Sequence, residues 1–440
     1  MSRLHFRITL RATLFLSFLF IITNSWIVSS QTQERSYPPF MFSLAPEKLS
    51  KTSTSQKEDV DIIITAQQHS PASLQDSRYW NASYPSYRWH QIMVEAGNRS
   101  KNRKNGGRMA ILHLAIYDAL AEVWKLKATT YQQAPFETHS GVEKREAPQA
   151  YSTYICEYSA TAAAAHSIIG YYFPDQKEFL NAKLDAFKRA RLQTGLQYPN
   201  DIARGLFIGE EIAKKYMTYA KTDRTDKLWT GSVPKDHSLW RGKPSKWDPM
   251  KAQWRPFTLN ASHQFRPGPP PTDWTADMEE LREFNKNNKH SAIAWKWRSE
   301  PVWDLLLERK ILEYDLDPFQ AAFASALFHT SRFDATITAW DGKYHYWGIR
   351  PFQYDPNFKP LLIDTPNFPG YPAGHTTVAG ALATALSHLF PIDADYFYAL
   401  ARECSESRFE GGVHFRTDNE VGLEVGEKVG RHVIDNFFRN

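Results

Sequence analysis

The sequence predicts an all-α fold made of two helical bundles. Apolar residues recur at helical spacing along most of the chain, and no stretch of any length alternates apolar and polar residues as a strand would. Hydrophobic residues make up 42% of the 440 residues and aromatic residues 14%, which is enough to fill a substantial core. We therefore expect helices packed on helices over most of the length.

The first thirty residues have the layout of a secretory signal peptide, residues 1–30. Three arginines precede an apolar stretch over residues 14–22, and small residues follow at 29 and 30. A signal anchor is the alternative, but polar residues at 23–25 end the apolar run well short of a membrane span. We expect cleavage near Ser30, a secreted or periplasmic protein and no stable membrane span.

Composition divides the rest of the chain into four segments. Residues 31–85 are polar without a pattern and predict a loose N-terminal segment. Helical patterns over 86–221 predict an N-terminal bundle, with helices near 108–125, 149–170, 175–191 and 202–216. A Trp- and Pro-rich stretch over 222–300 predicts a connector that wraps over the helices. Helical patterns over 301–440 predict a C-terminal bundle, which would carry the active site.

Start and stop signals mark the helices of this second bundle. Asp317 and Pro318 form an N-cap and a first-turn proline for a long helix. A helix that opens at His375 ends at Pro391. The last helix follows Asp418 and places glycines on one face, where a neighbouring helix can approach closely; they are Gly422, Gly426 and Gly430.

Charge and cysteine content exclude some classes of protein. The formal charge of +5 comes from 53 basic and 48 acidic residues that are interspersed, so the chain carries no nucleic-acid footprint. Two cysteines, Cys156 and Cys404, cannot form a disulfide framework. They form either one bridge or two separate buried thiols. The oligomeric state is left open.

Three segments of the second bundle place charged residues where loops meet helices. They are WDGKYHYWGIRPF, YPAGH and SRFEGGVHFRTD, and their chemistry-bearing residues are Lys343, Arg350, Gly374, His375, Arg408, His414 and Asp418. Arginine forks bind paired oxygens, lysine adds a point charge, and amides at a helix start point at the same anion. Asp418, one turn after His414, can hold its imidazole in one tautomer. The set predicts a tetrahedral oxyanion site, because so many clustered cations would repel one another without an anion.

The spacing of these blocks, K-x6-RP, P-x-GH and SR-x5-H-x3-D, resembles the signature of the vanadium-dependent haloperoxidases and the type 2 phosphatidic acid phosphatases. These two groups share a helical fold and an anion site. The upstream helical bundle and the Trp- and Pro-rich connector are more similar to the secreted haloperoxidase-like branch. Trp340 and Phe368 match the chloroperoxidase-like pattern, whereas bromoperoxidase-like members tend to carry histidine at the position of Phe368.

The resemblance implies vanadate as cofactor and hydrogen peroxide and halide as substrates. It implies that His414 is the axial ligand of the metal, or attacks phosphorus in a phosphatase, and that His375 is the acid–base group. The resemblance also implies an oxyanion clamp, which consists of Lys343, Arg350, Arg408 and the Gly374 amide. Two alternatives stay open: a secreted acid-phosphatase-like enzyme that acts on a phosphate ester through a phosphohistidine, without a cofactor, and a non-catalytic oxyanion-binding protein.

One position departs from the family pattern, and several histidines lie outside it. The family usually has serine before the glycine of the second block, and here the residue is Ala373. A serine hydroxyl would add a hydrogen bond to the anion of about 1–3 kcal/mol, so its loss should weaken the affinity for the cofactor. Five other histidines lie inside helical patterns and are expected to be structural: His113, His166, His329, His388 and His432.

Overall fold

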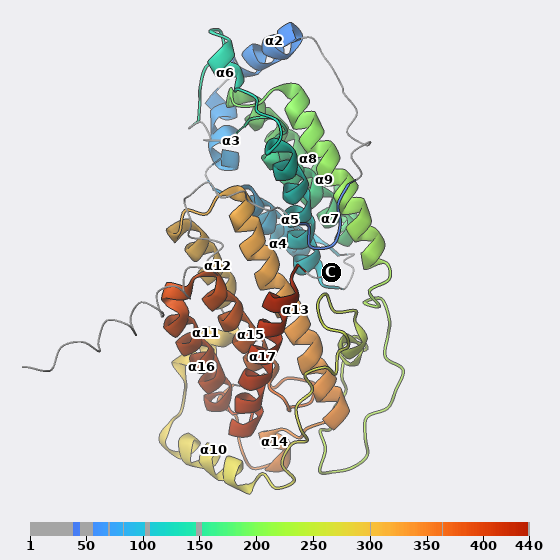
Figure 1. Ribbon diagram of the computed structural model, residues 1–440. Coiled ribbons are helices and arrows are strands. Elements are labelled where there is room, and N and C mark those ends of the chain that lie inside the picture. Colours follow the sequence, from blue (N-terminus) through green and yellow to red (C-terminus); the bar gives the residue numbers. More distant parts are fainter. Residues whose placement is uncertain are drawn as a thin grey trace, which may run out of the picture. The chain divides into compact units, whose positions relative to one another are not determined.

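The computed structural model describes residues 38–44, 56–68, 71–81, 83–101, 106–146, 152–299, 301–362 and 364–438 (Figure 1). These residues fall within one compact unit that runs from residue 37 to residue 440. Among them are sixteen α-helices, α2 to α17, and no strand, which confirms the predicted all-α fold. The described helices include none that is both long and apolar enough to pass through a bilayer. The predicted signal peptide lies outside the described residues.

The first group of helices surrounds an alanine-rich helix, α7. The group comprises α2 (Gln56–Gln67), α3 (Pro71–Asn81), α4 (Pro85–Arg99), α5 (Arg108–Lys127), α6 (Pro135–Thr138), α7 (Glu157–Tyr172), α8 (Lys177–Gln193) and α9 (Pro199–Ala220). Helix α7 packs on α4, α5, α8 and α9, and its four consecutive alanines are buried. Gly209 of α9 faces α7 so closely that a side chain there would overlap the Ala160 carbonyl oxygen. Small residues on both helices therefore allow their backbones to approach.

The stretch over 31–85 differs from the expected loose segment, because it contains helices α2 and α3. Residues 38–44 also enter the core, where Phe40 is fully buried. The carboxylate of Asp118 on α5 accepts hydrogen bonds from the backbone N–H of Phe40 (2.6 Å), Met41 (3.1 Å) and Phe42 (2.8 Å). The sequence does not reveal this order because the anchor lies about 80 residues downstream.

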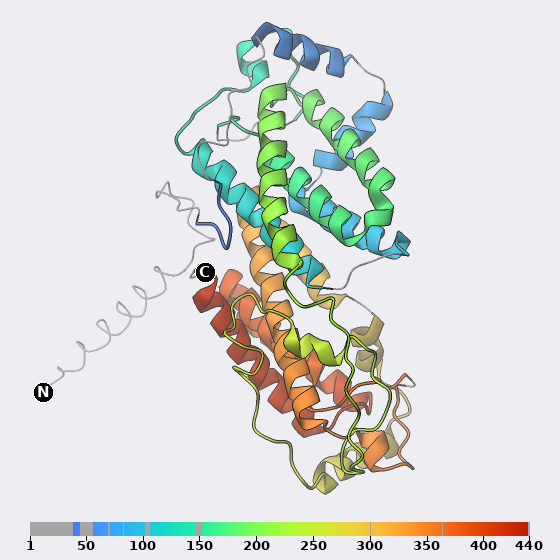
Figure 2. The same cartoon turned by 90° about the vertical axis from the view of Figure 1, so that its right-hand side faces the viewer.

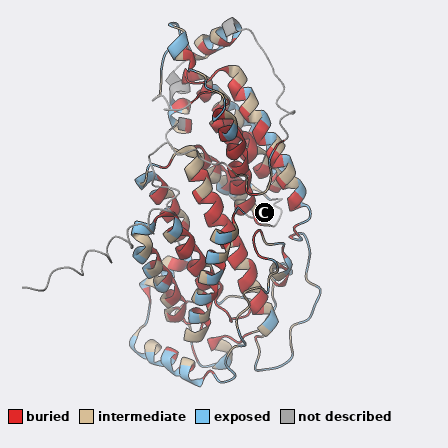
Figure 3. Cartoon of the chain, in the orientation of Figure 1, coloured by how far each residue is buried: buried red, intermediate tan, exposed pale blue. Residues whose placement is uncertain are grey.

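The stretch over 222–300 also contains more structure than predicted. It includes a short 3₁₀ turn, η3 (Pro249–Gln253), and two helices, α10 (Thr275–Asn287) and α11 (Ala292–Ser299). In this stretch, η3 packs on α13 and α11 packs on α16. Helix α10 buries only Met278 and Leu281 and is otherwise largely exposed (Figure 3). This helix was not predicted from the sequence, although its two buried residues lie one turn apart.

The second group is centred on the 29-residue helix α13. It comprises α12 (Val302–Glu313), α13 (Pro318–Tyr346), α14 (Pro351–Tyr354), α15 (Gly374–Leu389), α16 (Ala394–Glu410) and α17 (Arg416–Asn436). Asp317 is the N-cap of α13 and Pro318 lies in its first turn, as predicted; the Asp317 side chain accepts from the Gln320 N–H and completes a capping box that was not predicted. Helix α13 packs on α5 of the first group and on α15 and α17 of the second (Figure 2). Both groups therefore share this helix.

A glycine face joins α15 to α17, as the sequence predicts. A side chain at Gly422 would overlap the Thr376 hydroxyl, and one at Gly426 would overlap the Thr377 carbonyl oxygen. On the opposite helix, a Cβ at Gly380 would lie 2.5 Å from the Leu423 carbonyl oxygen. This close packing fixes the N-terminal ends of α15 and α17 beside each other, and both ends carry residues of the predicted site.

We predict that Gly426→Ala lowers the free energy of unfolding by about 1–3 kcal/mol, because the added methyl group must push the helices apart. This loss would appear even though alanine favours a helix over glycine by about 1 kcal/mol. Urea unfolding followed by circular dichroism measures it. Gly170→Ala in α7 is the matched control, since its Cβ would meet only Leu180 at 3.8 Å. Equal stability of the two variants would contradict the close contact.

Candidate oxyanion site

The seven predicted site residues lie at the ends of five helices. Lys343 is in the last turn of α13 and Arg350 caps α14; Gly374 and His375 open α15; Arg408 is in the last turn of α16; His414 precedes α17 and Asp418 is in its first turn. Helix ends carry backbone groups without intrahelical partners, so a site built there combines side-chain charges with free amides. The contacts below show that the structure brings these ends together.

Two of the cations are held side by side by one loop, residues 368–372. Lys343 is fully buried, and its ammonium donates to the carbonyl oxygens of Pro369 (2.9 Å), Gly370 (2.6 Å) and Pro372 (2.7 Å). Arg350 is also fully buried and donates from Nε to the Phe368 carbonyl oxygen (2.9 Å) and from Nη2 to that of Pro369 (3.3 Å). Both cations therefore share one carbonyl oxygen and are positioned by backbone, not by a carboxylate.

Aromatic rings form a wall beside these cations. The Phe368 ring centroid lies 5.4 Å from Lys343 Nζ and 5.2 Å from Arg350 Cζ, within cation–π range. The Trp340 ring lies 5.4 Å from that of Phe368. The two residues that match the chloroperoxidase-like pattern are thus neighbours next to the predicted anion position.

His414 is oriented by Asp418. Its Nδ1 lies 2.9 Å from Asp418 Oδ2, and both side chains are buried. Because a carboxylate accepts the Nδ1 hydrogen, Nε2 keeps its lone pair, and Arg350 Nη1 lies 3.2 Å from Nε2. Burial holds the pKa of His414 well below its usual value, and the charges of Arg350, Lys343 and Arg408 lower it further. The neutral Nε2 is therefore available as a ligand or nucleophile.

The site carries more positive than negative charge. Lys343, Arg350 and Arg408 contribute three positive charges and Asp418 contributes one negative charge, which gives +3 − 1 = +2 when all are ionised. Burial lowers the pKa of Lys343 well below its usual value, and the neighbouring Arg350 charge lowers it further. Burial likewise lowers the pKa of Arg408. An oxyanion in the site would reverse these effects by favouring the charged forms.

Two further features fit a tetrahedral oxyanion such as vanadate. Arg408 is buried, and its Nε has no hydrogen-bond partner among the residues that the structure describes. Gly374, at the start of α15, lies so close to Lys343 that an added Cβ would be 3.4 Å from Lys343 Cε. Helix-start amides, an unpartnered guanidinium and an ammonium are all donors, so this donor set suits an anion and not a metal cation alone.

His375 faces a cavity of about 370 Å³. Its side chain is exposed there, and the other walls include Trp297, Trp303, Trp340, Arg298 and Arg332. Desolvation lowers the pKa of His375 most, and the charges of Arg408, Lys343 and Arg350 lower it further. Because the ring is exposed to the cavity, water offsets part of the desolvation, but the cations keep it neutral near pH 7. A neutral imidazole on a cavity wall can accept a proton from a ligand.

The sequence did not predict most of this cavity wall. Trp297 comes from α11, Trp303 from α12 and Arg332 from α13, and none of them lies in the three-part motif. Only the packing of these helices brings the side chains together. Cys404 also lines the cavity, and both it and Cys156 are free, buried thiols, so the structure has two separate thiols and no bridge.

Comparisons with known proteins agree with the motif. Residues 391–439 match the family model of the VCPO second helical-bundle domain. Among solved structures, the chain is similar to a bacterial vanadium-dependent iodoperoxidase, with 20% identity, a TM-score of 0.57, and coverage of 86% of this chain and 95% of that one. No protein in the curated set matches.

The fold is also similar to a bacterial vanadium-dependent chloroperoxidase in two states. The apo form has 16% identity and a TM-score of 0.58, with coverage of 76% of this chain and 92% of that one. The holo form has 17% identity and a TM-score of 0.58, with coverage of 78% and 95%. At such identity these similarities show a shared helical fold.

We predict that Arg408→Met separates anion binding from folding. Loss of one charged hydrogen bond, worth about 1.5–3 kcal/mol, should weaken vanadate and phosphate binding roughly 10- to 150-fold. Without anion, stability should be unchanged or about 1 kcal/mol higher, because a buried cation without a counter-charge is removed. Titration calorimetry and urea unfolding measure the two effects.

Arg402→Met is the matched control for this variant, because Arg402 is exposed on the same helix, α16. It should change neither quantity. Unaltered anion affinity in Arg408→Met, or a large loss of stability without anion, would show that Arg408 has a different partner.

Proposed function

We propose that this protein is a vanadate-dependent haloperoxidase-like enzyme, which oxidises halide with hydrogen peroxide to a hypohalous species. The observation that carries the proposal is the chain of contacts Arg350–His414–Asp418, which presents a neutral Nε2 inside a cluster of buried cations. The fold shared with bacterial vanadium-dependent iodo- and chloroperoxidases supports it.

In this proposal the chain holds vanadate through one imidazole and an oxyanion clamp. His414 Nε2 would be the protein's ligand to vanadium, kept in the correct tautomer by Asp418. Lys343, Arg350, Arg408 and the Gly374 amide would neutralise the oxygens. Bound vanadate would supply a Lewis acid that activates peroxide. The carbonyl groups of the 368–372 loop would hold Lys343 and Arg350 in position to contact the anion.

His375 would move the protons. Its ring is exposed to the cavity next to the start of α15, so incoming peroxide can reach it from the solvent side. A neutral imidazole can take a proton from peroxide and return it to the oxygen that leaves as water. On the same cavity wall, Arg332 is paired with Asp304 and Arg298 with Asp364, so these arginines add little net charge, and three tryptophans would limit the water content.

We predict that His414→Ala abolishes halogenation, because no other group can replace a bond to vanadium. His375→Ala should slow turnover by about 10²- to 10⁴-fold and keep vanadate binding, because water can carry protons more slowly. A bromination or chlorination assay with peroxide, with and without vanadate, measures turnover, and calorimetry measures binding.

The exposed His388→Ala on α15 is the control and should retain full activity. A different result would be that the wild-type chain hydrolyses an aryl phosphate and is only inhibited by vanadate. That result would show that the protein is a phosphatase that uses the same histidine. Binding of oxyanion without either turnover would support the non-catalytic alternative. Equal loss of vanadate binding in His375→Ala and His414→Ala would show that the two roles are misassigned.

We predict that Ala373→Ser tightens vanadate binding by roughly ten-fold or somewhat more, from about 1–3 kcal/mol for a hydrogen bond to an anion. Ala373 is fully buried at the N-cap of α15, next to Gly374. The half-saturating vanadate concentration for halogenation should fall while the maximal rate stays similar. Ala373→Cys is the control, since a thiol of similar size is a weak donor. A more stable protein with unchanged vanadate affinity would mean that the hydroxyl caps the helix instead.

A further inference from the structure

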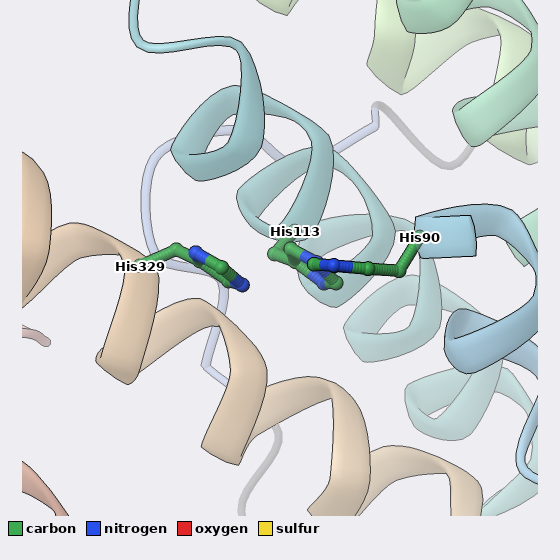
Figure 4. Close-up of side chains that lie close together, drawn as sticks. All are labelled: His90, His113 and His329. Carbon is green, nitrogen blue, oxygen red and sulfur yellow. The ribbon is translucent and has the colours of Figure 1, made fainter. Parts of the chain in front are cut away.

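Three histidines from three helices converge away from the oxyanion site. They are His90 of α4, His113 of α5 and His329 of α13, and Figure 4 shows their rings extending into one space between these helices. One ring nitrogen of each lies within 4.8 Å of the others. His90 Nδ1 is 3.0 Å from His113 Nε2, and the rings of His113 and His329 are parallel with centroids 4.5 Å apart. From the sequence, His113 and His329 were expected to be structural residues without a common site, so this cluster was not predicted.

The hydrogen bonding of this cluster is incomplete. His113 and His329 are each only 2% exposed, and Nδ1 of each is buried without a hydrogen-bond partner among the described residues. Buried polar atoms in folded proteins are nearly always paired, so these two ring nitrogens are exceptions, although in His113 it is the other nitrogen, Nε2, that faces His90. Burial holds the pKa of both imidazoles well below the usual value, so both are neutral and keep a lone pair. Neutral imidazole is the form that binds metals.

The surrounding cavity has the size and chemistry for a single cation. Its volume of about 10 Å³ is close to that of one water-sized sphere, which excludes an organic substrate. The cavity is also lined by two carboxylates of α12, Asp304 and Glu308. Both carboxylate oxygens of Asp304 accept hydrogen bonds from the Arg332 guanidinium, Oδ1 from Nη1 at 2.7 Å and Oδ2 from Nη2 at 2.9 Å. Glu308 is the second carboxylate on the same cavity wall.

We propose that His90, His113 and His329 bind one divalent transition-metal ion, for which zinc is the best fit, with Glu308 as the carboxylate ligand. Three imidazoles and one carboxylate form a common tetrahedral donor set for zinc. Zinc–nitrogen bonds of about 2.0–2.1 Å place ligand nitrogens about 3.4 Å apart in a tetrahedron. The closest pair, His90 Nδ1 and His113 Nε2 at 3.0 Å, is near that spacing already, and a ring nitrogen of His329 lies within 4.8 Å of the other two ligand atoms.

The ion would join the two groups of helices. It would tie α4 and α5 to the middle of α13, 14 residues (343 − 329) before Lys343, or about 21 Å along the helix. Asp304 lines both this small cavity and the larger cavity with His375, so the ion would also steady one wall of the proposed substrate cavity. The proposed metal site does not depend on the proposed haloperoxidase function, because none of its four ligands lines the larger cavity.

The test measures zinc in the full chain. After treatment with EDTA and removal of the chelator, the wild-type protein should take up one zinc ion per chain from zinc sulfate and keep it through dialysis, as measured by mass spectrometry of the metal. His113→Gln and His329→Gln should each lower zinc affinity at least 100-fold, and Glu308→Gln about 10-fold. The controls His388→Gln and His414→Ala should keep the full equivalent, the second because its imidazole belongs to the oxyanion site.

Two measurements on the wild-type chain avoid any effect of the variants on folding. Cobalt(II) bound at the site should give the intense visible absorption of a tetrahedral complex, and addition of zinc should raise the melting temperature. The proposal is overturned if the wild-type chain takes up no stoichiometric zinc, if His113→Gln and His329→Gln retain it, or if His414→Ala loses it. A weak octahedral cobalt spectrum would equally overturn the ligand set.

Discussion

The structure of the site depends on one constraint: three cations have to be kept out of water with one carboxylate to balance them. Moving charges from water into a protein interior costs several kcal/mol each, and a full complement of acidic partners would leave no charge for a ligand. The chain resolves this with backbone carbonyls. Lys343 and Arg350 are held by the 368–372 loop, whose dipoles position the cations without neutralising them. Positive charge therefore remains available to an oxyanion.

Such a cluster requires a rigid frame, because repulsion would otherwise open it. The glycine face between α15 and α17 sets the distance between the helix starts that carry His375 and Asp418. Backbone contact adds to this, since the Ala373 N–H donates to the Asp418 carbonyl oxygen at 2.9 Å. Lys343 lies on helix α13, which packs against both groups of helices. The helix packing therefore holds the like-charged side chains close together, where one anion can contact all of them.

Sequence reasoning succeeded where the information is local. Spacing within each motif block places Lys343 and Arg350, or His414 and Asp418, within a few turns of one another, and amphipathic stripes reveal helices such as α9. It failed where partners are distant in sequence. In helix α2 three of the apolar residues are consecutive, Ile62 to Ile64, and form no one-sided stripe, and the order of residues 38–44 depends on Asp118. The cavity wall of Trp297 and Trp303, and the histidine cluster, are produced only by tertiary packing.

The two sites divide the chemistry of α13 along its length. Its C-terminal end contributes an ammonium to a set of donors, which selects an anion. Its middle contributes the His329 imidazole to a set of acceptors beside two carboxylates, which selects a cation. Between them lies the Arg332–Asp304 ion pair, whose members both line the larger cavity. Because Asp304 also lines the small cavity beside the histidines, the two cavities have this carboxylate in common, and its charge is balanced by Arg332.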